Sequence, residues 1–164
     1  GRGSHSGESI VRTHDNAIAI TVEMNHRMMK SAPKGSSVME SAEQYLNSGV
    51  LALKLAAFIR ELGFEATAHV DGNYRVLCVP VAADAGLGEL GRLGLLMTPE
   101  FGPRVRLSAV TTNMPLVQDK PVTFGVQEFC SICKKCADNC PSGSIDTGSK
   151  KPVRGVKKWQ SNME

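Results

Sequence analysis

The chain has 164 residues, of which 41% are hydrophobic and 21% charged, and its net charge is +3. This length suits one domain, or one domain with a small additional segment. The charge is too small to indicate nucleic-acid binding, no apolar run reaches the ~18 residues of a transmembrane helix, and no secretory or twin-arginine signal is visible. Residues 1–6 resemble the remainder of an expression tag and are left out of the fold prediction.

The first half of the chain predicts a strand followed by a long helix. Residues 16–24 are β-branched and apolar over the length of a strand. Ser37 and Glu40 match a capping box, which places the N-cap of the helix at Ser37. The helix runs to about Leu62 and ends at Gly63. Its apolar stripe is predicted to face the core and comprises Val38, Ala42, Tyr45, Leu46, Gly49, Val50, Leu53, Ala56, Ala57 and Leu62.

Shorter elements follow the long helix. Residues 64–70 and 74–79 have strand composition on either side of an Asp-Gly-Asn turn at residues 71–73, which indicates a hairpin. Residues 80–85 predict a short helix with a proline in its first turn. Residues 104–111 alternate like a strand, with both arginines on one face. Strands and helices mix without a regular βαβ repeat, so the predicted class is an α+β or α/β sandwich rather than a doubly wound sheet.

A glycine-rich stretch lies between the short helix and the last of these strands. It formally matches the dinucleotide-binding fingerprint, but it follows a predicted helix rather than a strand, which argues against nicotinamide binding. Small residues at this density allow the main chain to approach a large planar ligand or a neighbouring segment closely. A purely structural loop is the alternative. The glycines are Gly86, Gly88, Gly91 and Gly94.

Four cysteines near the end of the chain form the most informative motif. Cys130, Cys133, Cys136 and Cys140, with a proline after the last, have the spacing of a bacterial ferredoxin-type [4Fe–4S] site. A zinc site would pair two C-x2-C knuckles across a longer loop, and a disulfide framework would suit a smaller, more cysteine-rich chain. Iron–sulfur ligation is therefore favoured over zinc and disulfides. Cys78, the remaining cysteine, is predicted to be a buried core thiol.

The ligand count sets a condition on this prediction. In two-cluster proteins the fourth cysteine of such a run serves the other cluster, and five cysteines are too few for two clusters. Either the protein continues beyond Glu164, which we favour, or it binds one incomplete or unusual cluster.

Three segments together resemble one family: Phe58-Ile-Arg-Glu-Leu-Gly63, the block from Asp84 through the glycines to Gly-Pro-Arg-Val-Arg-Leu107, and residues 119–142 with the cysteine run. They resemble the corrinoid iron–sulfur reductases typified by reductive dehalogenases, to which epoxyqueuosine reductases are related. The resemblance implies base-off cobalamin in a nitroreductase-like α/β sandwich at residues 7–125. It further implies a ferredoxin-like [4Fe–4S] segment at residues 126–164, which would be truncated.

The resemblance also implies roles for individual residues. By position in the motifs, Tyr45 on the long helix would be the proton donor. Arg104 would stabilise the developing phenolate or hold the leaving group, with Arg106 as the fallback. The glycine block with its arginine would bind the corrin, and the four cysteines of the run would bind iron. The corrin-binding set is Gly86, Gly88, Gly91, Arg92 and Gly94.

The function predicted from these residues is a cobalamin-dependent reductase that acts on a small organic substrate, halogenated in the type case. A ferredoxin or flavodoxin would donate the electrons, and a reducing compartment such as the cytoplasm suits the thiols. Two alternatives stay open: an iron–sulfur electron-transfer module without corrinoid, and a binding domain that has lost the chemistry. A basic cluster is either a solvated face or a docking site for an acidic electron donor, and comprises Lys150, Lys151, Arg154, Lys157 and Lys158.

Overall fold

The structure is a computed structural model that describes residues 14–153 and 155–160. Its centre is a three-stranded antiparallel sheet in the order β1-β5-β2, formed by β1 (Asn16–Glu23), β5 (Val105–Thr112) and β2 (Ala66–His69). The middle strand pairs along its whole length with β1, from Val105 opposite Glu23 to Thr112 opposite Asn16. The predicted strands at residues 16–24 and 104–111 are therefore confirmed within one residue at each end.

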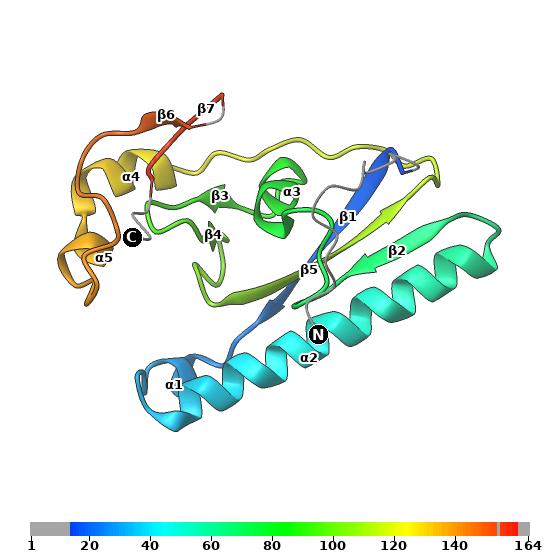
Figure 1. Cartoon of the computed structure of the whole chain (residues 1–164), viewed down its shortest axis with the longest axis horizontal. Coiled ribbons are helices and arrows are strands. Elements are labelled where there is room, and N and C mark those ends of the chain that lie inside the picture. Colours follow the sequence, from blue (N-terminus) through cyan, green and yellow to red (C-terminus); the bar gives the residue numbers. More distant parts are fainter. Residues whose placement is uncertain (1–13, 154, 161–164) are drawn as a thin grey trace.

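Helices lie on the sheet (Figure 1). The long α2 (Gly35–Glu61) runs along β1, β5 and β2, preceded by the single-turn α1 (His26–Met29), and the short α3 (Cys78–Asp84) contacts β1 and β5. The mixed helix-and-sheet architecture agrees with the predicted α+β class. None of the helices in the described ranges is both long and apolar enough to cross a membrane.

The remaining elements lie beyond the sheet. A short hairpin is made of β3 (Glu89–Leu90) and β4 (Leu96–Met97). The first three cysteines of the run lie on α4 (Val126–Cys133) and α5 (Lys135–Asp138), and Cys140 follows α5. A second hairpin, β6 (Lys151–Val153) and β7 (Val156–Lys158), follows it. Helix α4 begins at the predicted domain boundary, but whether two domains meet there stays a prediction.

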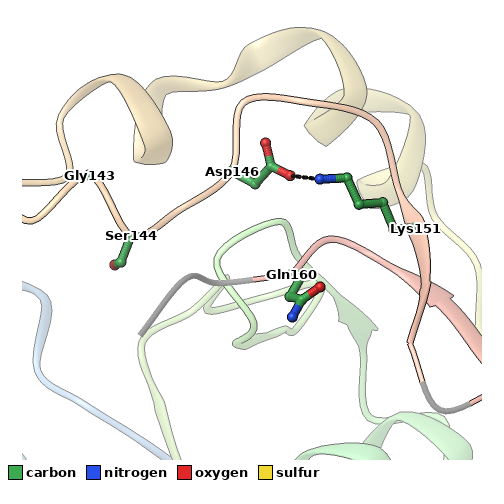
Figure 2. A pocket seen from close by; sticks show the side chains of 5 residues that line it. All are labelled: Gly143, Ser144, Asp146, Lys151 and Gln160. Carbon is green, nitrogen blue, oxygen red and sulfur yellow. Dashed lines mark hydrogen bonds and ion pairs between the residues drawn. The ribbon is translucent and has the colours of Figure 1, made fainter. Parts of the chain in front are cut away.

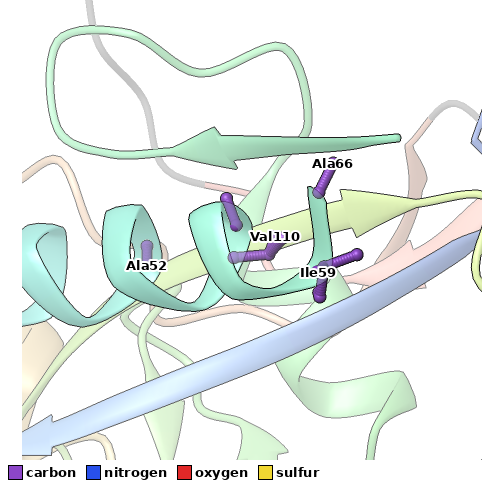
Figure 3. Close-up of a cluster of buried hydrophobic side chains, with 5 residues drawn as sticks. Ala52, Ile59, Ala66 and Val110 are labelled. Carbon is purple, nitrogen blue, oxygen red and sulfur yellow. The ribbon is translucent and has the colours of Figure 1, made fainter. Parts of the chain in front are cut away.

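The core is built mainly from small side chains, and Figure 3 shows its central cluster. Alternate residues of β5 face α2, so Val110 packs against that helix. Ser108 on the same face donates a hydrogen bond to the carbonyl of Ser48, 2.9 Å away. Small residues let α2 lie close to the sheet, and Ile59 is the largest side chain of the cluster that is almost fully buried. The cluster comprises Ala52, Ala56, Ile59, Ala66 and Val110.

The predicted beginning of α2 is wrong, whereas its predicted end is confirmed. The helix begins at Gly35 with Lys34 at the N-cap, and the Ser37 hydroxyl donates to the Lys34 carbonyl at 2.8 Å instead of capping. Glu40 is buried and accepts the backbone N–H of Asn25 at 2.6 Å, so its carboxylate serves the preceding turn. At the other end, Gly63 has a φ of +90°, the left-handed conformation that suits a glycine after a helix.

Two further predictions are wrong. The apolar stripe assigned to the core includes Val38, Leu46 and Leu53, which are 64%, 68% and 56% exposed. The buried face of α2 instead carries Ser48, Ala52, Ala56 and Ile59 among others. The second strand of the expected hairpin is also absent: the turn at residues 71–73 forms, but residues 74–77 are irregular and lead directly into α3.

Candidate functional site

A cavity of about 660 Å³ lies between the sheet, α2 and the β3–β4 hairpin. Most of its walls are apolar, supplied by the entrance to α3, the hairpin and the first residues of β5. Polar groups enter from α2 and β5 at one side. The second hairpin contributes Trp159 after β7, together with the polar side chains of Lys158 and Gln160. Apolar walls with few polar groups are typical of a small-molecule site. The apolar lining includes Val76, Leu77, Val79, Pro80, Leu90, Leu93, Leu95, Leu96, Pro103, Val105 and Leu107.

Tyr45 and Arg106 form the polar end of this cavity. The guanidinium carbon of Arg106 lies 4.4 Å from the centre of the Tyr45 ring, a distance at which a cation is attracted to an aromatic face. One guanidinium nitrogen of Arg106 donates to the Ser41 hydroxyl at 2.7 Å. The Nε atom of Arg106 is buried and has no hydrogen-bond partner in the described part of the chain. A donor in that position is available to a bound molecule.

Arg104 lies elsewhere, although it shares a strand face with Arg106. Its guanidinium donates to the Glu23 carboxylate at 3.0 Å and to the Met24 carbonyl at 2.6 Å. It is not among the residues that line the cavity. The structure therefore brings Tyr45 together with the fallback arginine and not with Arg104, which joins the beginning of β5 to the end of β1.

The glycines of the predicted cofactor site divide into two groups. Gly91 and Gly94 line the cavity. Gly86 and Gly88 instead permit contacts within the chain: a Cβ atom on Gly88 would lie 2.2 Å from the Met97 carbonyl oxygen, and one on Gly86 would lie 2.6 Å from that of Lys120. The predicted close approach of main chain exists, and at these two positions the neighbour is another segment of the protein. Gly91 also makes room within the chain, because an added Cβ would lie 2.6 Å from the Met97 side chain.

Tyr74 and Cys78 also line the cavity, and the sequence analysis gave neither of them a role in a site. Tyr74 donates its hydroxyl to the Asp71 carboxylate at 2.7 Å, and burial, followed by that hydrogen bond, raises the pKa of Tyr74. Cys78 is buried as predicted, on α3 rather than on a strand, and burial raises the pKa of its thiol. The one sequence feature that could have drawn attention to Tyr74 is its position directly after the turn at residues 71–73.

The β3–β4 hairpin anchors the cysteine segment. Glu89 is buried, and its carboxylate accepts the backbone N–H of Phe124 at 2.5 Å and that of Val126 at 3.3 Å, which satisfies donors at the beginning of α4. The Gln127 side-chain amide donates to the Leu90 carbonyl. The hairpin that walls the cavity on one side thus holds the cysteine-bearing helix on the other.

The four cysteines of the run are free, partly exposed thiols. Cys130 and Cys133 lie on α4 and Cys136 on α5, with a left-handed residue, Lys134, between the helices. The Ser142 and Ser144 hydroxyls lie 3.4 and 3.5 Å from the Cys140 sulfur, and their hydrogen bonds lower the pKa of Cys140 to about 6, which favours the thiolate. Within the described ranges, no group of three or more histidine, cysteine or acidic side chains is gathered as a metal site.

Arg92 was predicted to bind a cofactor together with the glycines, and it points into the cysteine segment. Its side chain is 3% exposed and donates to the Cys130 carbonyl at 3.0 Å. It also donates to the Asp146 and Gly148 carbonyls at 2.7 and 2.9 Å. The guanidinium stacks on Trp159, 4.6 Å from the ring centre. Arg92 thus connects the cysteine segment to a side chain of the cavity wall.

The predicted basic cluster is partly engaged in contacts. Lys151 forms an ion pair with Asp146 at 3.1 Å beside a small cleft that Gly143, Ser144 and Gln160 also line (Figure 2). The backbone N–H of Gly148, followed by Lys151, lowers the pKa of Asp146. The Lys150 ammonium lies 4.6 Å from the centre of the Trp159 ring. Arg154 lies outside the described residues, and docking of an electron donor stays a prediction.

Comparison with known proteins identifies relatives of this chain. No family model matches the chain. The chain is 45% identical over 139 residues to the tetrachloroethene reductive dehalogenase of Sulfurospirillum multivorans. This alignment covers 85% of this chain and 27% of the relative. It is 44% identical over 128 residues to the tetrachloroethene reductive dehalogenase of Dehalobacter restrictus, an alignment that covers 78% of this chain and 23% of that relative. The chain is homologous to a segment of the reductive dehalogenases. It spans about a quarter of the length of these curated relatives.

Solved structures agree with this homology. The chain superposes on the catabolic reductive dehalogenase NpRdhA with a TM-score of 0.86 and 32% identity, over 90% of this chain and 22% of that one. The epoxyqueuosine reductase of Streptococcus thermophilus matches with a TM-score of 0.58 and 25% identity, over 80% and 36% of the two chains. The higher TM-score and identity place this chain nearer to the dehalogenases, as the Gly-Pro-Arg-Val-Arg motif predicted. The nitroreductase-like and ferredoxin-like descriptions of its two parts stay predictions.

Proposed function

We propose that this chain forms a substrate-facing wall of a cobalamin-dependent reductive dehalogenase that removes a halide from a small organic substrate with electrons from an iron–sulfur cluster. The observation that carries the proposal is the contact of Tyr45 with Arg106 at the polar end of an apolar cavity, in a homologue of reductive dehalogenases. A solved dehalogenase with 32% identity is described as carrying out B12-dependent dehalogenation. A cavity with these groups suits proton delivery to an apolar molecule.

Three features of the cavity fit cobalamin. Its walls are largely apolar, as the face of a corrin ring requires. Gly94 lines it and has no atom within 4 Å of an added Cβ, so a flat ring can approach the main chain there. The Nε atom of Arg106 is a buried donor without a partner in the described residues, and a polar group of the cofactor or of the substrate would satisfy it.

The cysteine segment fits an iron–sulfur cluster by the chemistry of its donors. Cys130, Cys133, Cys136 and Cys140 are free thiols with ferredoxin-type spacing, and the low pKa of Cys140 favours the thiolate that binds iron. Cys130, Cys133 and Cys136 would hold one cluster, and Cys140 would either complete it or, as in two-cluster proteins, serve a second cluster. When bound, cobalamin supplies a strongly reducing metal centre and the cluster supplies its electrons.

The residues of the chain then perform the proton chemistry. Replacing a halogen by hydrogen consumes an electron pair and one proton and releases a halide. Tyr45 holds that proton on its phenolic oxygen. The Arg106 guanidinium, held by its hydrogen bond to Ser41, favours the phenolate that forms as the proton leaves. The apolar walls exclude water, which strengthens this electrostatic effect.

The second tyrosine of the cavity is unsuited to proton donation. The hydroxyl proton of Tyr74 is engaged by the Asp71 carboxylate, and burial and this hydrogen bond raise the pKa of Tyr74. The chain has two tyrosines in all. Tyr74→Phe is therefore a matched control for Tyr45→Phe, because both variants remove one hydroxyl from the same cavity.

The proposal is tested by anaerobic reconstitution of the chain with iron, sulfide and cobalamin. After desalting, iron and cobalt per chain are measured, followed by halide release from tetrachloroethene with a chemical reductant. We expect both metals to be retained. Tyr45→Phe should lower the rate at least ~100-fold, the typical contribution of a positioned general acid, and Tyr74→Phe less than ~10-fold.

Other outcomes are equally informative. Retention of iron without cobalt would favour the electron-transfer module. Retention of neither metal would contradict the proposal for this chain. Equal losses of rate in the two tyrosine variants would contradict the assignment of Tyr45 as the proton donor, even if both cofactors bind.

A further inference from the structure

Arg92 is a buried cation whose hydrogen-bond acceptors are all neutral carbonyls, and its charge also acts on the nearby Asp146 carboxylate. Its side chain is 3% exposed, and its hydrogen bonds go to the carbonyls of Cys130, Asp146 and Gly148. The Asp146 carboxylate is paired with Lys151 at 3.1 Å. Among the described residues, no ion pair neutralises Arg92 directly. A charge removed from water is costly unless a counter-charge or several hydrogen bonds compensate for it.

A cluster on the cysteine run would place a further counter-charge near Arg92, beside the Asp146 carboxylate that Lys151 already engages. One of its hydrogen bonds, 3.0 Å long, goes to the backbone of Cys130, the first residue of the cysteine run. A cubane cluster bound by four thiolates is anionic, and its reduction adds a further negative charge. A buried cation nearby stabilises the reduced form more than the oxidised form, because Coulomb energies are larger where water is excluded. Net charge and hydrogen bonding are among the factors that set cluster potentials.

We propose that the buried charge of Arg92 raises the reduction potential of the iron–sulfur cluster that the cysteine run binds. The inference rests on the proposed function only in requiring that the cysteine run binds a cluster. The three carbonyl contacts fix the cysteine segment from both ends, since Cys130 lies at its beginning and Gly148 follows its last cysteine. The stacked Trp159, which lines the cavity, connects this contact to the substrate side.

The competing explanation is that Arg92 only fastens loops together. Two substitutions separate the explanations. Arg92→Gln keeps hydrogen-bond donors but removes the charge. Arg92→Lys keeps the charge but loses the planar set of donors. If the charge sets the potential, Arg92→Gln lowers it and Arg92→Lys does not. A purely structural role changes the amount of cluster bound in both variants and leaves the potential of the bound fraction unchanged.

The experiment is a reductive titration of the chain after anaerobic reconstitution with iron and sulfide alone. Dithionite supplies electrons one at a time in the presence of redox mediators, and the electron paramagnetic resonance signal of the reduced cluster gives the midpoint potential. Lys135→Gln is the matched control, because Lys135 is an exposed cation within the same cysteine run. Solvent screens its charge, so its removal should leave the potential near that of the wild type.

We expect the midpoint potential of Arg92→Gln to fall below that of the wild type, with Arg92→Lys and Lys135→Gln close to it. An unchanged potential in Arg92→Gln overturns the inference. If Arg92→Gln binds no iron, Arg92→Lys decides: iron retained at the wild-type potential supports the role of the charge, and loss of iron in both contradicts it. A wild-type chain that binds no iron contradicts the proposed cluster itself, and the inference with it.

Discussion

The orientation of α2 can be tested by replacing one large aliphatic residue with alanine on each of two faces of the helix, Ile59 on the buried face and Leu53 on the exposed face. Ile59 is 1% exposed and packs in the cluster with Ala52, Ala56 and Val110, whereas Leu53 is 56% exposed. Replacing a buried isoleucine by alanine costs about 2–5 kcal/mol, depending on how far the site can collapse. The small neighbours of Ile59 have few atoms that could fill the space. We therefore expect Ile59→Ala to lose about 3–5 kcal/mol of unfolding free energy, in the upper part of that range.

Leu53→Ala should change the unfolding free energy by no more than about 0.5 kcal/mol, the usual range for a surface substitution. Urea unfolding followed by far-UV circular dichroism measures both variants. With a slope near ~2 kcal/mol/M, the Ile59→Ala midpoint should fall by about 2 M. A loss for Leu53→Ala that equals or exceeds the loss for Ile59→Ala would refute the described face of α2 and restore the stripe that the sequence pattern predicted.

Three further predictions concern the cavity and its surroundings. Gly88→Ala should destabilise the chain by more than about 1 kcal/mol, because its Cβ would lie 2.2 Å from the Met97 carbonyl oxygen; Gly35→Ala, with no atom within 4 Å of its Cβ, should be neutral or stabilising in the same thermal unfolding assay. Burial, with smaller effects from neighbouring cations, lowers the pKa of His69 from 6.5. The unfolded chain therefore takes up the proton first, and the free energy of unfolding should fall as the pH drops below about 6.5. Unfolding measured across that pH range should show a smaller fall in this free energy for His69→Gln than for the wild type. Cobalamin should quench the fluorescence of Trp159, the single tryptophan, because it lines the cavity; unchanged fluorescence with cobalamin bound would place the cofactor elsewhere.

Local signals predicted the ends of elements where one residue determines the backbone. Gly63 ends α2 because the left-handed conformation that it adopts is costly for other residues. The alternation of residues 104–111 predicted β5, since every second residue packs on the same side of a central strand. The capping box failed for a related reason: the buried carboxylate of Glu40 binds a backbone N–H from another turn, which no local pattern records.

The face of α2 could not be predicted, because the helix is apolar on more than one side. Large residues such as Leu46 and Leu53 dominate the periodicity, yet small ones, Ala52 and Ala56, make the contact with the sheet. A hydrophobicity pattern favours the larger side chains, whereas close packing of a helix on a sheet favours the smaller ones. Local composition also led to the wrong prediction of a strand at residues 74–79, because no neighbouring strand is available to pair with them in the described structure.

The candidate site illustrates where motif position stops being informative. Arg104 and Arg106 lie two residues apart on the same strand face, so sequence pattern gave no physical reason to prefer the second. The register of β5 separates them: Arg104 reaches the end of β1, where Glu23 and the Met24 carbonyl engage it, and Arg106 lies one pleat further along, over Tyr45. One arginine is engaged by its neighbours, whereas the other retains a buried donor with no described partner. The arginine suited to chemistry is thus identified by the bonds that it leaves unmade.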